Sequence, residues 1–310
     1  MDISIIIVNF NSFQMLKECL DSIVKHTNPK IIFEIIIIDN NSNEGNIRSF
    51  LKDYSQVKLV INTDNRGFAA ANNQGIKIAK GKYILFLNND TLFLEDSISK
   101  ILAFLGKNGQ NSIIGCRLLN GDRSHQASVV DRDSLSNSFG ENFFLYLIFK
   151  KIRALNKYYL SSNEPDSPSE VDIIKGAFIF CTKKIVDELS GFDERFFFYS
   201  EETDLCIRAI LKGYKIYYFP QTQIIHYGGY ATDKNLWFKF KNQTTARIQI
   251  FQKHYSGLSF FLLISFHFVG IFIRIFVYFL GGIVTLSLPL VRKSWYYFRQ
   301  LYIYPKNLFK

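Results

Sequence analysis

The residues with the clearest chemical potential follow the apolar stretch of residues 83–87. Three polar side chains, Asn88, Asn89 and Asp90, come directly after it. Because a continuous apolar run is typical of a strand buried on both faces, we expect these side chains at the carboxyl end of a strand. Ligands bind at that edge of open α/β sheets, where a carboxylate suits a hard divalent cation held against phosphate oxygens. An isolated Asn-Asn-Asp is also typical of a simple turn.

Two other predicted strands end in residues of the same kind. The apolar run 3–8 is followed by Asn9 and Asn11, and the run 33–38 is followed by Asp39. The first strand is not followed by Gly-x-Gly-x-x-Gly, and the chain has no Gly-x-x-x-x-Gly-Lys-Ser/Thr, so neither a dinucleotide fingerprint nor a P-loop is expected. Side chains would therefore have to recognise a nucleotide, although each amide taken singly is more typical of a turn or a helix cap. The further amides of this kind are Asn65 and Asn73.

A third group of candidates is acidic and consists of Glu201, Glu202 and Asp204. Apolar residues at helical spacing follow, and the helix is expected to end before Gly213, so the acids lie in or just before its first turn. The helix dipole favours acids there, and it would suffice to explain a single Glu. Three carboxylates beside the aromatic run 196–199 indicate a chemical role instead.

The composition limits the class of protein. The chain has 310 residues, of which 48% are hydrophobic, and this suits one large domain or a domain with an appendage and argues against disorder. The four cysteines are scattered without paired spacing, which indicates a reducing compartment rather than disulfides or a zinc cluster. No signal peptide is expected, because the first residues have no basic leader and no small-residue cleavage site. The net charge of +10 is compatible with nucleic acid, anionic lipid or a phosphorylated substrate.

The elements that must position these residues alternate between strand and helix. Polar residues at each carboxyl end predict a doubly wound, mostly parallel α/β sheet with a nucleotide-sized crevice. Residues 116–170 lose this rhythm, and we interpret their basic, aromatic patch at 143–159 as a variable acceptor-side insert or a surface helix. The predicted strands lie at residues 3–8, 33–38, 57–61, 83–87, 171–180 and 215–219, and the predicted helices lie at residues 15–26, 47–51, 69–80 and 205–210.

Four stretches, in this order, resemble the family 2 inverting glycosyltransferases, and the nearest branch is that of the bacterial rhamnosyltransferase-like enzymes. They are residues 4–12 (SIIIVNFNS), 34–42 (EIIIIDNNS), 65–75 (NRGFAAANNQG) and 87–90 (LNND). The resemblance spans roughly residues 3–230. It implies a GT-A fold, which is a Rossmann-like sheet flanked by helices, with a nucleotide-sugar-binding half at 1–115 and an acceptor and catalytic half at 116–230.

The resemblance also implies a metal site. Residues 88–90 match the family's Asp-x-Asp-type motif, but the first carboxylate is an amide here, so the metal role falls to Asp90. His226 matches the family's C-terminal histidine, which completes the metal site in related enzymes, although a lone His at a strand end is usually structural. Imidazole favours Mn²⁺ over Mg²⁺, because magnesium prefers all-oxygen shells.

The same resemblance assigns the general base and the substrate contacts. The family motif Glu-Asp-x-Asp-Leu-Cys-x-Arg places the base at Glu202, where this chain has the longer acid, with Glu201 and Asp204 in reserve. Asp204 and Arg208 are expected to brace the helix rather than react. Gly176 permits a close approach of substrate, and it is assigned to the acceptor together with Ala177. The donor-binding residues are expected to be Val8, Asn9, Asn11, Asp39, Asn65, Gly67, Phe68, Asn73, Asn88, Asn89 and Asp90.

The carboxyl-terminal part has a different composition. Residues 258–291 are almost wholly apolar but contain His267, Arg274, Gly281-Gly282 and Pro289. A single membrane span with Arg274 near its middle would cost about 3 kcal/mol or more. We therefore expect two shorter segments that lie in or re-enter the membrane interface and let Arg274 and His267 reach headgroups. The basic and aromatic residues 292–299 are expected to act as an interfacial anchor, so residues 258–310 are predicted to associate with the membrane. A pair of helices packed in a protein core is the alternative. In either case, residues 231–257 are expected to connect the carboxyl-terminal part to the sheet.

Three functions remain open on this basis. The first is a metal-dependent inverting glycosyltransferase at the cytoplasmic face of the cell membrane. It would move a sugar, with rhamnose as one candidate, from a dTDP- or UDP-sugar to a saccharide or lipid-linked saccharide in cell-surface polysaccharide synthesis, with no nucleic-acid partner. A nucleotidyltransferase would share the sheet and the metal, but its glycine-rich phosphate loop is missing. A non-catalytic membrane-bound binding protein is the third, because Glu202 departs from the family motif.

Overall fold

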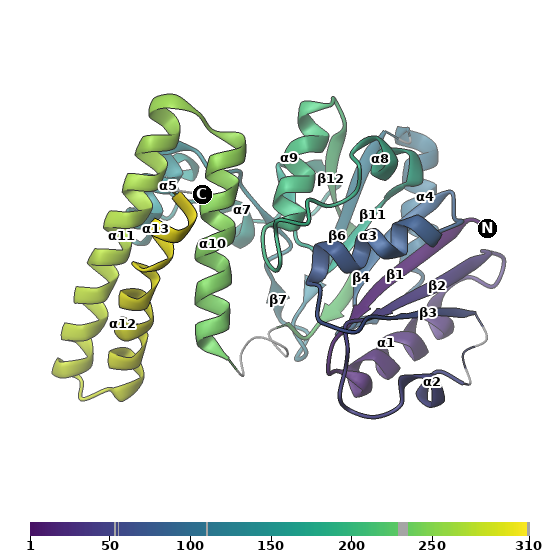
Figure 1. Ribbon diagram of the computed structural model, residues 1–310. Helices are drawn as coiled ribbons and strands as arrows, with labels where there is room; N and C mark the ends of the chain where they lie inside the picture. Colours follow the sequence, from purple (N-terminus) through teal and green to yellow (C-terminus); the bar gives the residue numbers. More distant parts are fainter. Residues whose placement is uncertain (53, 55, 110, 229–234, 309–310) are drawn as a thin grey trace. The chain divides into compact units, whose positions relative to one another are not determined.

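A computed structural model describes residues 1–52, 54, 56–109, 111–228 and 235–308 (Figure 1). Within these ranges the chain forms two compact units. Unit 1 comprises residues 1–130, 163–197 and 201–228, and unit 2 comprises residues 131–162, 198–200 and 235–308. The segment 131–162, which we expected in the acceptor half, therefore clusters with the carboxyl-terminal helices.

Unit 1 is built on a mixed, largely parallel sheet. Its strands are β1 (Ile3–Asn9), β2 (Phe33–Asp39), β3 (Val57–Ile61), β4 (Tyr83–Asn88), β5 (Thr91–Phe93), β6 (Ser112–Leu119), β7 (His125–Gln126), β8 (Val129–Val130), β9 (Ser169–Glu170), β10 (Ile173–Ile174), β11 (Phe178–Thr182) and β12 (Lys215–His226). The main sheet has the order β3-β2-β1-β4-β11-β6-β12-β5, while β7 pairs with β6, β9 pairs with β12, and β8 pairs with β10. The first four strands are parallel, and β11 runs antiparallel to β4.

Helices cover both faces of this sheet because its central strands are apolar on both sides. Alternate residues of β1 face opposite ways: Ile5 and Ile7 share a buried cluster with Leu16 of α1, whereas Ile6 lies against Gly75 of α3. A Cβ at Gly75 would lie 2.5 Å from Ile6 Cγ2, so the small-residue helix is needed for this close packing. The helices of unit 1 are α1 (Phe13–His26), α2 (Ile47–Phe50), α3 (Phe68–Ile78), α4 (Ser97–Asn108), α8 (Lys183–Glu188) and α9 (Glu201–Leu211).

The predicted strands agree closely with the structure in the first 90 residues. The strand expected at 171–180 is divided into β10 and β11, because Lys175–Ala177 leave the ladder between them. Conversely, β12 continues from Lys215 to His226 through an irregularity between Phe219 and Gln223, so Pro220 bends the strand without ending it. The sequence analysis did not anticipate β5, α4 and β6.

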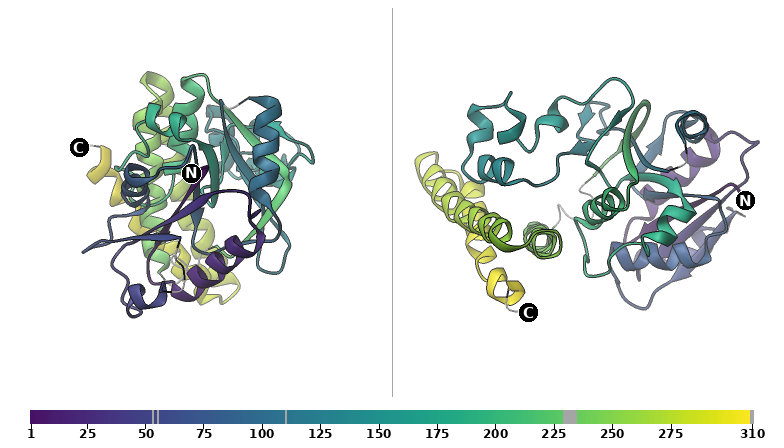
Figure 2. Two further views of the ribbon diagram at one scale, coloured as in Figure 1. Left: turned by 90° about the vertical axis from the view of Figure 1, so that its right-hand side faces the viewer. Right: turned by 90° about the horizontal axis from the view of Figure 1, so that it is seen from above.

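Unit 2 is helical. Its elements are α5 (Leu135–Asn142), α6 (Leu145–Ile148), the 3₁₀ turn η1 (Arg153–Leu155), α7 (Tyr159–Ser162), α10 (Leu236–His254), α11 (Gly257–Val284), α12 (Leu288–Gln300) and α13 (Ile303–Leu308). The long helix α11 runs beside α12 and also contacts α5 (Figures 1 and 2). Residues expected to form a connecting region thus include α10, which packs against α11, α12 and α13.

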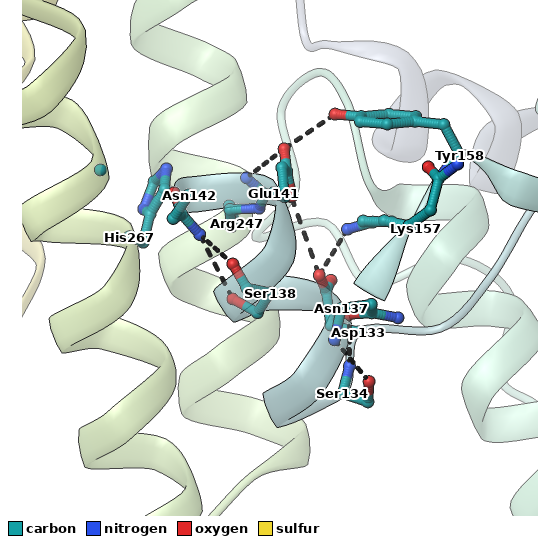
Figure 3. Close-up of polar contacts among 12 residues, drawn as sticks. Asp133, Ser134, Asn137, Ser138, Glu141, Asn142, Lys157, Tyr158, Arg247 and His267 are labelled. Atoms are coloured by element: carbon teal, nitrogen blue, oxygen red, sulfur yellow. Dashed lines mark hydrogen bonds and ion pairs between the residues drawn. The ribbon is translucent and has the colours of Figure 1, made fainter. Parts of the chain in front are cut away.

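A network of buried charged side chains joins α5 and the residues just before α7 to α10 (Figure 3). Arg247 Nη2 lies 2.6 Å from Glu141 Oε2, and Lys157 Nζ lies 2.5 Å from Asp133 Oδ1. Burial alone would raise the pKa of Glu141, but the charges of Arg247 and Lys157 hold that pKa well below its usual range. Tyr158 Oη also donates to Glu141 Oε1 at 2.8 Å.

The structure corrects our expectation for residues 258–291. Instead of two shorter segments, α11 is one continuous helix that passes through Gly281 and Gly282 and ends at Val284. Arg274 is engaged by protein groups: it donates to the carbonyls of Gly270 and Glu141 and lies over the ring of Phe144. His267 is buried, with its Nδ1 2.6 Å from Tyr304 Oη. Among the described residues α11 is the helix that is long and apolar enough to cross a membrane.

Candidate active site

The two expected metal ligands lie together at the carboxyl edge of the main sheet. Asp90 follows β4, His226 ends β12, and Asp90 Oδ1 lies 3.4 Å from His226 Nε2. The second carboxylate oxygen of Asp90 accepts from the backbone N–H of Gly228 at 3.1 Å, and its carbonyl accepts from the N–H of Tyr227 at 3.0 Å. Asn88 Nδ2 lies 3.2 Å from the same His226 Nε2. Residues 136 positions apart are thus joined because β4 and β12 end at one edge.

The ends of β1, β2 and β4 are joined by their own polar side chains. Asn9 is fully buried and donates through Nδ2 to Asp39 Oδ1 at 2.8 Å, while its Oδ1 accepts from Asn89 Nδ2 at 2.8 Å. Asp39 also accepts from the backbone N–H and the hydroxyl of Ser42. Val8, which pairs with Asn88 in the β1–β4 register, is partly exposed. These contacts fix the rim of the expected donor site and leave Asn9 little capacity for a ligand.

Other expected donor-binding residues serve the loops around this rim. Asn11 has φ 49°, a left-handed conformation that Asn tolerates, and its Oδ1 accepts from the N–H of Asn43. Asn65 Oδ1 accepts from the N–H of Gly67 at 3.0 Å. Gly67 has φ 81°, and a Cβ there would lie 2.5 Å from the carbonyl oxygen of Phe197, so only Gly fits.

The contacts of α3 connect it to the loop that precedes α9. Phe68 donates its backbone N–H to the carbonyl of Phe197 at 3.0 Å. Asn73 accepts from the N–H of Phe192 and donates to the carbonyl of Phe192 and to Glu194 Oε1. The amide of Asn73 is therefore engaged by protein groups, and it clamps residues 192–194 rather than facing open space.

The expected base lies beside the expected acceptor contact. Glu202 is partly exposed in the first turn of α9, and a Cβ at Gly176 would lie 3.5 Å from Glu202 Cβ. The next residue, Ala177, accepts from the backbone N–H of Asn88 at 3.1 Å. Residues 176–177 thus connect the carboxylate of Glu202 to the end of β4, which carries Asp90.

The two reserve acids are buried and differ in their surroundings. Glu201 is 7% exposed, and within the described structure its Oε2 has no hydrogen-bond partner. Burial, and to a smaller extent the charge of Glu202, raises the pKa of Glu201 well above its ordinary value. Asp204 is fully buried and accepts from Arg208 Nε at 2.7 Å, while the other guanidinium nitrogens of Arg208 donate to the carbonyls of Leu189 and Gly191. This is the bracing contact that the sequence predicted.

Comparison with known proteins shows the family. The model of the family described as "Glycosyl transferase family 2" matches residues 4–167, which is more than half of the chain. This chain is a member of glycosyltransferase family 2.

Curated relatives agree with this assignment. The family 2 chain is 36% identical over 119 residues to a "Poly(ribitol-phosphate) beta-glucosyltransferase" of Bacillus spizizenii, covering 37% of this chain and 19% of that protein. It is 25% identical over 199 residues to the "Rhamnosyltransferase WbbL" of Escherichia coli, covering 62% of this chain and 72% of that protein. The first three curated relatives are matched over 17% to 30% of their length.

A solved structure shows the fold. The mannosyltransferase PcManGT of Pyrobaculum calidifontis, solved in complex with GDP-Man and Mn²⁺, superposes with a TM-score of 0.59 at 14% identity, covering 99% of this chain and 86% of that one. The family 2 chain therefore has the GT-A fold that the sequence predicted.

The two candidate metal ligands of the family 2 chain suit a divalent cation. Neighbouring ligands in an octahedral shell with bonds of about 2.1 Å lie about 3 Å apart, so Asp90 Oδ1 and His226 Nε2, 3.4 Å apart, are placed to share one cation. The described residues contain no group of three or more His, Cys, Asp or Glu side chains that would enclose a metal. The remaining positions of the shell would be left to substrate oxygens and water.

Two further polar residues of the candidate site, Gln126 and Asn40, were not predicted from the sequence. Gln126 in β7 contacts His226, with its Oε1 2.7 Å from His226 Nδ1. Asn40 is buried after β2, where its Nδ2 donates to Asn65 Oδ1 and to the carbonyl of Gly67, and its Oδ1 accepts from Asn62. Asn40 belongs to a stretch quoted for the resemblance, so a signal existed, whereas Gln126 lies in the segment whose pattern could not be interpreted.

Proposed function

We propose that this chain is a metal-dependent inverting glycosyltransferase. It moves a sugar from a nucleoside diphosphate to a saccharide or lipid-linked saccharide acceptor in the synthesis of cell-surface polysaccharide. The observation that carries the proposal is that Asp90 and His226 lie together at the carboxyl edge of the sheet. Glu202 lies beside Gly176, and the next residue, Ala177, is hydrogen-bonded to Asn88 at the end of β4. The relative WbbL, a rhamnosyltransferase by its name, supports rhamnose as a donor sugar to be tested.

Glu202 is the proposed general base. Its carboxylate accepts the proton of an acceptor hydroxyl while that oxygen forms a bond to the anomeric carbon and the bond from this carbon to the diphosphate oxygen breaks on the opposite face. Gly176 leaves room beside Glu202 for the acceptor, since a side chain there would contact the carboxylate stem. The single displacement inverts the configuration at the anomeric carbon.

Asp90 and His226 are the proposed cation ligands, and the imidazole favours Mn²⁺ over Mg²⁺. When bound there, the cation supplies neutralisation of the charge that develops on the departing nucleoside diphosphate. The other residues position substrates: the hydrogen-bonded rim of Asn9, Asp39 and Asn89 holds the strand ends in register for the nucleotide.

Calorimetric titration with UDP, dTDP and GDP, each with and without Mn²⁺, tests the binding site. We expect Mn²⁺-dependent binding of one pyrimidine diphosphate and its loss in Asp90→Ala. The matched control is Asp187→Ala, which removes an exposed aspartate of α8 that pairs with Lys183. Failure of all three nucleotides to bind would contradict a nucleotide-sugar transferase.

Turnover of the bound donor tests the chemistry separately. Glu202→Gln keeps the shape of the side chain but cannot accept the proton, so we expect unchanged donor affinity and a loss of turnover of about 10²- to 10⁴-fold. If the variant turns over as the wild type does, Glu202 is not the base. If the wild type binds donor without any turnover across a panel of acceptor saccharides, the chain is a non-catalytic binding protein.

We also propose that unit 2 attaches the enzyme to the cytoplasmic face of the cell membrane. Large apolar side chains on α11 are exposed, among them Phe261 (64%), Phe276 (61%) and Val284 (82%). Trp295 on α12 is also exposed and stacks on Phe298, which is typical of an interfacial anchor. This position would bring a lipid-linked acceptor to the same surface as the enzyme.

A further inference from the structure

Gln126 contacts both the imidazole ring and the backbone of His226. Its Oε1 lies 2.7 Å from the ring nitrogen Nδ1, and its Nε2 donates to the backbone carbonyl of His226 at 2.8 Å. The pairing of β7 with β6, in which Gln126 is opposite Leu118, places Gln126 at this edge of the sheet. Such double contacts hold both the backbone and the ring of one residue.

Hydrogen-bond accounting fixes the orientation of the Gln126 amide. Its nitrogen has two hydrogens, and the two near neighbours on that side are the carbonyl of His226 and Asn120 Oδ1, at 2.8 and 2.9 Å. The His226 carbonyl can only accept. Asn120 is oriented in turn by Nδ2, which donates to the carbonyl of His125 at 3.0 Å, so its Oδ1 faces Gln126 as an acceptor. Rotating the Gln126 amide would place three oxygens against one another.

The proton on the imidazole follows from this orientation. Because Gln126 presents Oε1 to the ring, Nδ1 of His226 must carry a hydrogen and donate it. The lone pair of the neutral ring is then on Nε2, the nitrogen that faces Asp90 Oδ1 and Asn88 Nδ2. The contact with Asn88 is consistent, since an amide N–H donates to a nitrogen with a lone pair.

We infer that Gln126, held by Asn120, is a positioning residue that fixes the Nδ1–H tautomer of His226 and aims Nε2 at the cation site beside Asp90. The inference rests on the proposed metal-dependent function. Histidine ligands ordinarily donate their second ring N–H to a carbonyl or carboxylate, and loss of that partner lowers metal affinity by about 10- to 100-fold. Here an amide side chain provides the carbonyl, and its two N–H groups are anchored to the backbone of His226 and to the turn residue Asn120.

NMR of the full-length wild-type protein with ¹⁵N-labelled histidine tests the tautomer without any metal. The chain has five histidines, so the spectrum of His226→Ala identifies the signals of His226. At a pH high enough for the ring to carry a single proton, we expect that proton on Nδ1 and a bare, pyridine-like Nε2. A proton on Nε2 with a bare Nδ1 would overturn the inference, and this result does not require that any Gln126 variant folds.

Mn²⁺ titration, followed by electron paramagnetic resonance, tests the consequence for the cation. Gln126→Met keeps the length of the side chain and removes the amide, so we expect a mixture of both His226 tautomers and a 10- to 100-fold higher dissociation constant for Mn²⁺. The matched control is Gln74→Met, which removes an amide that pairs with Asn62 instead of His226 and should bind Mn²⁺ as the wild type does.

The variants separate the inference from the proposed function. Wild-type affinity in Gln126→Met, with lost affinity in His226→Ala, would overturn the role of Gln126 and keep the metal site. Equal Mn²⁺ binding by wild type and His226→Ala would remove the metal site, and the inference with it.

Discussion

Asn88 stands where the glycosyltransferase family has its first acidic motif residue, and its amide competes for the lone pair that a cation would take. Asn88 Nδ2 lies 3.2 Å from His226 Nε2. An aspartate cannot donate there, and it adds a negative ligand beside Asp90. We therefore expect Asn88→Asp to bind Mn²⁺ about tenfold more tightly, because affinity rises with the charge of the ligands. Calorimetry with Mn²⁺ alone measures this, and an unchanged or weaker affinity would place the cation away from residue 88.

Glu201 predicts a pH dependence of stability. Its pKa is raised by burial, so the unfolded chain releases the proton near the ordinary value of 4.5 while the folded protein still holds it. The contribution of Glu201 to the free energy of unfolding is fully present below that pH. It falls as the pH rises toward the pKa of the folded protein, by up to about 1.4 kcal/mol per pH unit. Glu201→Gln removes the titrating group, so its stability relative to wild type should increase from pH 5 to pH 8 in urea unfolding. A constant difference across this range would show that Glu201 is ionised in the folded protein.

Individual site residues were predictable where the sequence marks the end of a strand. Asp90 and Asp39 follow apolar runs, and their placement needs only the rule that parallel strands share one carboxyl edge. Asn73 was expected to bind the donor through its amide, and in the structure this amide hydrogen-bonds to the carbonyl of Phe192 and to Glu194. The partner of an amide depends on a loop 119 residues away, and no local pattern encodes that contact.

At the scale of elements, α9 depends on one internal ion pair. Asp204 is fully buried, and Arg208 joins it to the carbonyls of Leu189 and Gly191 at the end of α8. Arg208→Met would remove the guanidinium that is hydrogen-bonded to this buried carboxylate, at a cost of about 3–5 kcal/mol. The matched control is Lys183→Met, which breaks the exposed pair with Asp187 and should cost at most about 0.5 kcal/mol. Urea unfolding measures both, and equal costs would contradict the bracing role.

Asp204→Asn separates bracing from catalysis on the same helix. The amide oxygen still accepts from Arg208, so we expect a loss of stability of about 1–3 kcal/mol and turnover of the folded fraction within a few-fold of wild type. A loss of turnover in the folded fraction as large as that of Glu202→Gln would move the base to Asp204.

Element boundaries were predictable from periodicity wherever burial is regular. Strand β4 was expected at residues 83–87 and spans Tyr83–Asn88, of which all but Asn88 are buried. The glycines at 281 and 282 suggested a break, but α11 passes through them because Gly282 packs against Val291 of α12, where a Cβ would lie 2.6 Å from Val291 Cγ2. A glycine that permits close helix packing and one that ends a helix look the same in sequence.

At the scale of the whole molecule, the sequence predicted a sheet unit and an apolar carboxyl-terminal part. It did not predict which groups bind the charged side chains of that part. Arg274 is satisfied by the carbonyls of Gly270 and Glu141, so the insert at 131–162 supplies what the membrane headgroups were expected to supply. That contact joins residues more than 130 positions apart, beyond the reach of local pattern. The exposed side of α11 is apolar: Phe272, Phe276 and Leu280 lie on it and recur at helical spacing.

This apolar face gives the last prediction. Phe276→Glu places a charge where a lipid surface would lie, and the substitution should weaken binding to vesicles of phosphatidylethanolamine and phosphatidylglycerol by about 3 kcal/mol, or about a hundredfold. The matched control is Leu211→Glu on α9 of unit 1, where an apolar side chain of similar exposure, 68% against 61%, is replaced. Co-sedimentation at low and high salt measures both, and the basic residues Arg292 and Lys293 should make wild-type binding weaker at high salt. If Phe276→Glu and Leu211→Glu sediment with vesicles as the wild type does, α11 does not contact the lipid, and its exposed face must be covered by protein.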